Sequence, residues 1–257
     1  MSYKIDLNCD LGESFGAYTI GMDEKVIPLI TSANVACGFH ASDPVVMDRT
    51  VKLAAKSGVM IGAHPGFPDL QGFGRRQMNL SPNEVRTSVM YQVGALMAFC
   101  KAYGVCLQHV KPHGALYNMA GKDAKLAEAI VEGIASVDST LILLGLSGSE
   151  MLKAAESKGL PFAKEVFADR AYEEDGSLVA RSKEGSMITD EHEAVSRVIR
   201  MIQEKKVKAI TGKDINIDAQ SVCVHGDGAK ALAFVSKIRI ALEYEEIEIS
   251  PLSKIVL

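Results

Sequence analysis

A recurring unit dominates the sequence: a short apolar run ends in ionisable residues, and an amphipathic segment follows it. Seven such runs occur along the 257 residues, at Tyr3–Asp10, Ser32–His40, Val59–His64, Leu107–His113, Leu141–Ser147, Phe162–Ala168 and Ser221–His225. Strand patterns that alternate with helix patterns are typical of a parallel sheet. No Pro/Gly/Ser-rich linker separates the units, so we predict a single α/β domain that covers residues 1–257.

The helical segments carry start and stop signals. Ser81-Pro82-Asn83-Glu84 is a capping box with proline at the first helical position. Asp43-Pro44 is expected to begin another helix, which Gly58 can end in a left-handed conformation. Thr189 is expected to cap a third helix. These signals predict where helices cover the sheet.

Charge and cysteine content exclude several classes of protein. Lys and Arg total 28 and Asp and Glu total 32, which gives a net charge of −4 without any basic tract. Nucleic acid and anionic membranes are therefore not expected as partners. The five cysteines are odd in number and form no C-x-x-C motif, which argues against a disulfide framework or a cysteine-rich zinc site. Residues 1–6 contain no apolar signal segment, so we expect a cytoplasmic protein.

Ionisable side chains gather just after the apolar runs. In a parallel barrel, all strands end at the same face, so residues far apart in the sequence would meet there. The candidates at these ends are Asp10, Glu13, His40, His64, Lys111, His113, Asp169, Arg170, His225 and Asp227. His109 lies inside an apolar run and fits a core histidine, and His192 fits a solvated residue in the first turn of a helix.

Carboxylates and imidazoles at short range support two kinds of chemistry. Asp10, His40 and His64 would suit a divalent metal with an open coordination position. The same groups can act as general acid and base without a metal. No H-E-x-x-H motif is present, so both interpretations stay open.

Cationic residues provide candidates for charge stabilisation. Lys111 could stabilise an oxyanion or a phosphoryl group, or could be a surface lysine. Arg75 lies in the irregular segment 66–80 and could clamp a carboxylate, whereas Arg76 is as consistent with a solvated residue. No Walker A motif occurs. The segment His225–Ala229 is a candidate phosphate site at a helix N-terminus, or a tight turn that requires glycine.

Long motifs in the chain resemble the LamB/YcsF family. They are Asp6–Glu13, Ser32–His40, Ile61–Asp69 and Val110–Tyr117, with further matches at Phe167–Tyr172 and Val224–Asp227. The resemblance spans nearly the whole chain. It implies an irregular seven-stranded, TIM-like β/α barrel that is similar to the glycoside hydrolase/deacetylase superfamily.

The resemblance also implies a reaction. Family members are the A component of a 5-oxoprolinase, which converts 5-oxo-L-proline, ATP and water into L-glutamate, ADP and phosphate together with B and C subunits. ATP would then be a nucleotide cosubstrate. Asp10, Glu13, His40 or His64 would activate water, Lys111 or Arg75 would balance negative charge, and His113 or His225 would protonate the departing nitrogen. We expect the substrate to contact Arg75, Asp169, Arg170, His225 and Asp227.

Two other functions are consistent with the same residues. A metal-dependent, deacetylase-like hydrolase of a sugar or an amide would use the Asp/His group without ATP. A carrier subunit would bind 5-oxoproline and pass it to partners, and it would tolerate replacement of Asp10 and His64.

Overall fold

The structure, a computed structural model, describes residues 3–224 and 229–257. Seven parallel strands form a closed barrel in the order β1-β2-β3-β4-β5-β6-β9, and β9 pairs back with β1. The strands are β1 (Lys4–Leu11), β2 (Ser32–Ala36), β3 (Met60–His64), β4 (Leu107–Val110), β5 (Ile142–Leu146), β6 (Phe162–Phe167) and β9 (Ser221–Cys223). Each strand lies within one of the seven predicted runs, except that β1 extends one residue further, to Leu11. The predicted seven-stranded β/α barrel is therefore confirmed.

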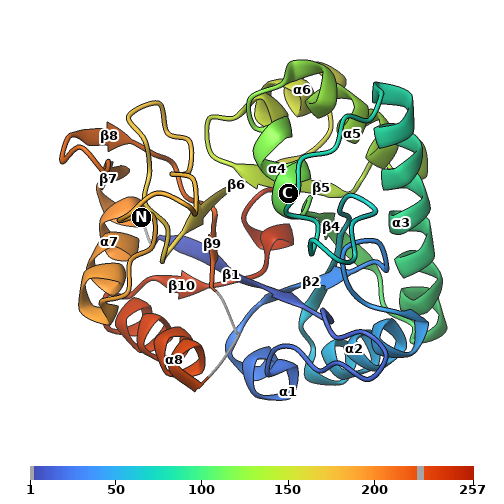
Figure 1. Ribbon diagram of the computed structural model, residues 1–257. Coiled ribbons are helices and arrows are strands. Elements are labelled where there is room, and N and C mark those ends of the chain that lie inside the picture. Colours follow the sequence, from blue (N-terminus) through green and yellow to red (C-terminus); the bar gives the residue numbers. More distant parts are fainter. Residues whose placement is uncertain (1–2, 225–228) are drawn as a thin grey trace.

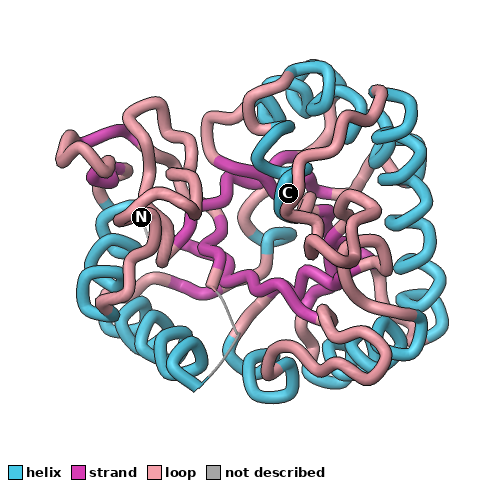
Figure 2. Tube along the Cα trace, in the orientation of Figure 1, coloured by secondary structure: helices cyan, strands magenta, loops and turns pink. Residues whose placement is uncertain are grey.

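Helices surround the strands, as Figures 1 and 2 show. They are α1 (Asp23–Val26), α2 (Pro44–Ser57), α3 (Pro82–Ala102), α4 (Gly114–Ala120), α5 (Ala124–Val137), α6 (Glu150–Lys158), α7 (Glu191–Gln203) and α8 (Ala229–Tyr244), with 3₁₀ turns at Ile27–Leu29 and Leu252–Lys254. No helix in the described ranges is long and apolar enough to span a bilayer.

Local signals in the sequence account for most helix ends. The Asp43 carboxylate accepts hydrogen bonds from the first-turn amides of α2, and Gly58 ends that helix at φ 69°. At α3, the Ser81 and Glu84 side chains form the predicted reciprocal capping box. The prediction for α7 was one residue early: Asp190, and not Thr189, is the cap, because its carboxylate accepts from the Glu193 amide at 2.8 Å.

The barrel also has elements that the sequence did not predict. Between β6 and β9 the chain forms an antiparallel hairpin of β7 (Lys206–Lys208) and β8 (Asp214–Asn216). A short strand, β10 (Glu248–Ile249), extends the sheet by pairing with the start of β1.

The barrel interior is polar near β1 and β2. Asn8 donates to Ser221 Oγ at 2.8 Å, and Asn34 donates to Asn8 Oδ1 at 2.8 Å. His109 Nε2 lies 2.7 Å from Asn34 Oδ1 and is fully buried, as expected for a core histidine. A Cβ at Gly62 would collide with the His109 ring, so glycine is required there. These bonds satisfy polar groups that would otherwise destabilise the interior.

Candidate active site

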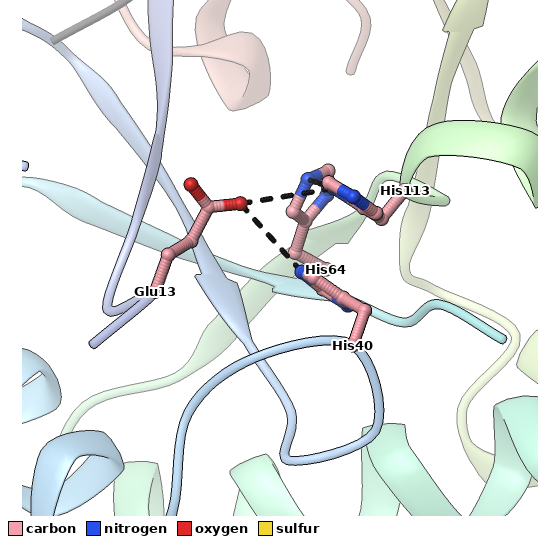
Figure 3. Close-up of side chains that lie close together, drawn as sticks. All are labelled: Glu13, His40, His64 and His113. Carbon is pink, nitrogen blue, oxygen red and sulfur yellow. Dashed lines mark hydrogen bonds and ion pairs between the residues drawn. The ribbon is translucent and has the colours of Figure 1, made fainter. Parts of the chain in front are cut away.

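Four side chains meet where β1, β2, β3 and β4 end. Each offers one ligand atom, and all of these atoms lie within 4.8 Å of one another (Figure 3). They belong to Glu13, His40, His64 and His113, which we call the Glu/His cluster. All four residues are buried. The parallel barrel therefore brings together residues that are up to 100 positions apart in the sequence.

Two backbone carbonyls fix the orientation of two imidazoles. His64 Nδ1 lies 2.7 Å from the Lys111 carbonyl oxygen, and His113 Nε2 lies 2.8 Å from that of Phe73. A carbonyl only accepts, so these two nitrogens carry the protons. In the neutral rings, the lone pairs are then on His64 Nε2 and His113 Nδ1, which face each other at 3.0 Å. Two facing lone pairs repel each other unless a proton or a cation lies between them.

His40 is the third histidine of the cluster. Its ring stacks on the His113 ring at 3.7 Å, and its Nε2 lies 3.6 Å from Glu13 Oε1. Neither ring nitrogen of His40 has a hydrogen-bond partner among the described residues, although the side chain is fully buried. Burial lowers the pKa of His40 well below its usual value and that of His113 to about 3. Both rings are therefore neutral at physiological pH and keep a lone pair for a ligand.

These residues fit a divalent metal ion. Three imidazoles and one carboxylate are ligands that zinc and similar ions accept. Ligand atoms about 2.0–2.1 Å from a tetrahedral ion lie about 3.3 Å apart, close to the 3.0 Å between the two imidazole lone pairs and the 3.7 Å from Glu13 Oε1 to His113 Nδ1. A ring nitrogen bonded to a carbonyl is also the usual arrangement of metal-binding histidines.

The set differs from the predicted one. Asp10 was expected to join His40 and His64, but it lies outside the Glu/His cluster, and Glu13 and His113 belong to it instead. Asp10 contacts the edge of the cluster, where its Oδ2 lies 3.3 Å from His64 Nε2. The residue spacing could not distinguish Asp10 from Glu13, because both follow the same strand.

A buried ion network adjoins the cluster. Lys111 Nζ lies 3.0 Å from Asp10 Oδ1 and 2.7 Å from Glu165 Oε1, and Tyr117 donates to Glu165 Oε2 at 2.6 Å. Burial alone would lower the pKa of Lys111, but the charges of Asp10 and Glu165 and the neighbouring Cys223 hold it well above its usual value. Lys111 is thus a buried cation and not a surface lysine. The Asp10 side chain is 20% exposed and faces solvent more than its partners do.

Glu165 and Tyr117 were missed by sequence reasoning. Glu165 lies inside β6, where it is fully buried among apolar residues, and Tyr117 lies on α4. The sequence prediction considered only residues that directly follow a strand, and neither Glu165 nor Tyr117 does so. The available signal was a charged residue within an apolar strand, because such a residue is rarely buried without a partner.

The remaining predicted residues lie elsewhere. Arg75 and Arg170 line a cavity beside the cluster, and the charge of Asp169 acts on Arg170. Arg76 forms an ion pair with Asp69 within its own loop. His225 and Asp227 lie outside the described residues.

The buried histidines predict a pH-dependent stability for the metal-free chain. Burial lowers the pKa of His40 well below 6.5 and those of His109 and His113 to about 3, so below pH ~6.5 the unfolded chain binds protons that the folded chain does not. Asp6 has the opposite effect, because burial raises its pKa to about 6. The free energy of unfolding should change little between pH ~7 and ~8 and fall below pH ~6, by about 1.4 kcal/mol per pH unit for each net proton.

Urea unfolding at pH 7.5, 6.0 and 5.0, with a chelator present, checks this expectation. A His109→Gln variant is the matched control, because glutamine can still hydrogen-bond to Asn34 but does not titrate. Its stability should fall less steeply with decreasing pH than that of the wild-type chain. Equal stability of the wild-type chain at pH 7.5 and 5.0 would contradict the assignment of neutral buried rings.

Comparisons with known proteins match nearly the whole chain. A family model described as the LamB/YcsF family matches residues 5–256. A protein from Clostridium beijerinckii that is named as the A subunit of 5-oxoprolinase is 70% identical over 253 residues, which are 98% of this chain and 99% of the relative. A protein of the same name from Campylobacter jejuni subsp. jejuni is 57% identical over 254 residues, 99% of this chain and 100% of the relative.

Solved structures agree with the fold. The crystal structure of "Lactam Utilization Protein" from Thermus thermophilus is 46% identical, with a TM-score of 0.91 over 96% of this chain and 99% of that chain. A putative cellobiose-phosphate cleavage protein from Enterococcus faecalis is 14% identical with a TM-score of 0.60 over the full length of both chains. That second likeness concerns the fold alone.

Proposed function

The chain belongs to the LamB/YcsF family, and we propose on this basis that it opens the ring of 5-oxo-L-proline in an ATP-dependent reaction, as the A component of a multi-subunit 5-oxoprolinase. The observation that carries the proposal is the convergence of the Glu/His cluster with Asp10 and Lys111 at the carboxyl ends of the barrel strands. We further propose that B and C subunits complete the enzyme and that it works in the cytoplasm, where ATP is available.

The reaction requires activation of a stable amide. A γ-phosphoryl group passes from ATP to the lactam oxygen, which makes the adjoining carbon more electrophilic. Water then adds to that carbon, the carbon–nitrogen bond breaks and the nitrogen takes up a proton, which leaves an acyl phosphate of glutamate. A second water hydrolyses this acyl phosphate and releases phosphate. The products are L-glutamate, ADP and phosphate. A site for this chemistry must therefore supply a base, a proton donor and positive charge.

The Glu/His cluster is suited to supply part of that charge. Glu13, His40, His64 and His113 would hold a divalent cation, which contributes positive charge and Lewis acidity when bound. The backbone bonds of His64 and His113 keep their lone pairs directed into the cluster. A pKa of about 3 keeps the His113 ring neutral at physiological pH, and the Phe73 carbonyl holds its one proton, so we assign it a binding role and not that of the acid.

Asp10 is the residue that we assign to proton transfer. Its side chain is the most exposed in the ion network, and its Oδ2 lies beside the cluster at His64. Asn34 and Lys111 hold its other oxygen, Oδ1, at 2.8 and 3.0 Å. In our proposal, Oδ2 takes a proton from the attacking water and passes it to the departing nitrogen. Lys111 is a positioning residue, because its charge is already balanced by two carboxylates.

A metal-dependent hydrolase that needs no ATP is the second candidate, and the Glu/His cluster is the observation that favours it. The experiment that separates the two measures glutamate and ADP formed from 5-oxoproline and ATP by this chain alone, by the B and C subunits alone, and by all three together. We expect equal amounts of both products from the full mixture only. Ring opening without ATP would rule out the proposed coupling, and ring opening by this chain alone would rule out the need for the B and C subunits.

A further inference from the structure

A cavity of about 810 Å³ lies beside the Glu/His cluster at the same end of the barrel. Two of its lining residues tie it to the cluster. Gly114 directly follows His113, and Arg75 directly follows Gly74, whose Cα packs so closely on His40 and His113 that a Cβ there would collide with them. A molecule in this cavity would therefore lie next to the proposed reaction site.

Arg170 is a buried cation in the wall of this cavity. It is only 5% exposed, and its Nη2 donates to the Val179 carbonyl at 2.6 Å. Neither its Nε nor its Nη1 has a hydrogen-bond partner, and no carboxylate lies within ion-pair distance, among the side chains that the structure describes, those of residues 3–224 and 232–257. A buried guanidinium without a counter-ion is costly, which indicates that an anion completes its surroundings.

The other charges of the cavity are consistent with an anion. Three further cations line it, namely Arg75, Lys122 and Arg181. The three lining carboxylates are each engaged locally: Asp123 caps α5, Glu150 pairs with Lys153 at 2.6 Å, and Asp175 accepts from the Ser177 amide at 2.9 Å. Burial, together with the neighbouring guanidinium charges, lowers the pKa of Arg170 to about 10. The lining carboxylates thus leave the positive charge of Arg170 available to an anion.

A second polar group in the same wall also lacks a partner. Ser149 is the N-cap residue of α6, but its hydroxyl makes no capping bond. Its Oγ is buried and has no hydrogen-bond partner among the described residues. The positive end of the α6 dipole lies at this position and favours negative charge.

We propose that this cavity binds the polyphosphate chain of ATP, with Arg170 as the buried contact and Arg75 on the side that faces the Glu/His cluster. The volume lies near the upper end of the ~300–1,000 Å³ typical of small-molecule pockets and far exceeds the needs of a five-membered lactam. The inference rests on the proposed function, because that function makes ATP the cosubstrate. The other candidate phosphate site, at 225–229, lies outside the described residues except for Ala229.

The test is calorimetric binding of Mg²⁺ with AMP-PNP, a non-hydrolysable ATP analogue, to the full chain alone and assembled with the B and C subunits. Arg170→Gln should lose this binding or weaken it at least tenfold, yet keep or raise the free energy of unfolding, because the unpaired buried charge is gone. Lys122→Ala should weaken binding severalfold. Lys125→Ala is the matched control, an exposed lysine three residues away that does not line the cavity, and it should bind like the wild type.

The outcomes separate this proposal from the proposed function. Unchanged affinity in Arg170→Gln, or no binding of the analogue to the wild-type chain in either form, overturns the cavity as the nucleotide site. Binding of inorganic phosphate or 5-oxoproline without any binding of the analogue also overturns it, because the cavity would then take a smaller anion. In each of these cases, the proposed function would still be supported if the wild-type mixture formed glutamate and ADP in a coupled reaction.

Discussion

Replacement of His64 by alanine is expected to lower the coupled formation of glutamate and ADP by the assembled enzyme at least ~10²-fold, because a direct ligand should matter at least as much as the outer partners of a metal site, whose loss costs up to about 100-fold. His64 contacts the Lys111 carbonyl, His113 and Asp10, so the substitution removes one cluster ligand and one neighbour of the proposed base. Asp10→Asn should have an effect of similar size, because it removes the base with little change of shape.

The matched control is His192→Ala, which deletes the same side chain at an exposed position in α7. This variant should keep wild-type activity. Circular dichroism and the urea midpoint confirm that each variant is folded before its activity is compared. Activity of His64→Ala and Asp10→Asn within a few-fold of wild type would exclude both residues from the chemistry and would favour a carrier.

Replacement of Lys111 by methionine is expected to lower the free energy of unfolding by about 3–5 kcal/mol, the usual cost of breaking a buried ion pair. Methionine fills a similar volume but leaves Asp10 and Glu165 without their cation. The loss arises from the unpaired carboxylates and not from lost packing. Urea denaturation at pH 7.5 measures it.

The double variant Lys111→Met/Glu165→Gln distinguishes a loss of stability caused by an unpaired carboxylate from one caused by lost packing. Glutamine removes the unpaired charge and can still accept the hydrogen bond from Tyr117, so the double variant should be more stable than Lys111→Met alone. Lys158→Met breaks an exposed ion pair with Glu132 and should cost less than about 1 kcal/mol. A cost for Lys111→Met as small as that of Lys158→Met would refute the buried network.

The sequence was sufficient to predict the strands and the residues that follow them. An apolar run that ends in a histidine places that side chain at the mouth of a parallel barrel, and this geometry is how His40, His64 and His113 meet. The sequence could not show whether Asp10 or Glu13 belongs to the cluster, because the answer depends on where the chain turns after β1.

Interactions that depend on barrel closure could not be predicted. Glu165 on β6 and Asp10 after β1 reach the same Lys111 ammonium because β9 pairs with both of these strands and closes the barrel. Ser149 precedes α6 as a helix cap would, but the sequence could not show that its hydroxyl makes no capping bond. Nor could the sequence show that Arg170 has no carboxylate within ion-pair distance in the described part of the chain.

The most direct test of the Glu/His cluster as a metal site in the reaction is the coupled rate as a function of metal bound to this chain. The chain is stripped with a chelator, freed of the chelator, reconstituted with Zn²⁺, Mn²⁺ or Co²⁺ in steps, and mixed with the B and C subunits. ATP is supplied with a fixed excess of Mg²⁺. We predict that glutamate and ADP formation rises in proportion to bound metal and saturates at one ion per chain, and that His40→Ala abolishes this binding. A full coupled rate from the stripped chain would contradict the metal-binding role of the Glu/His cluster.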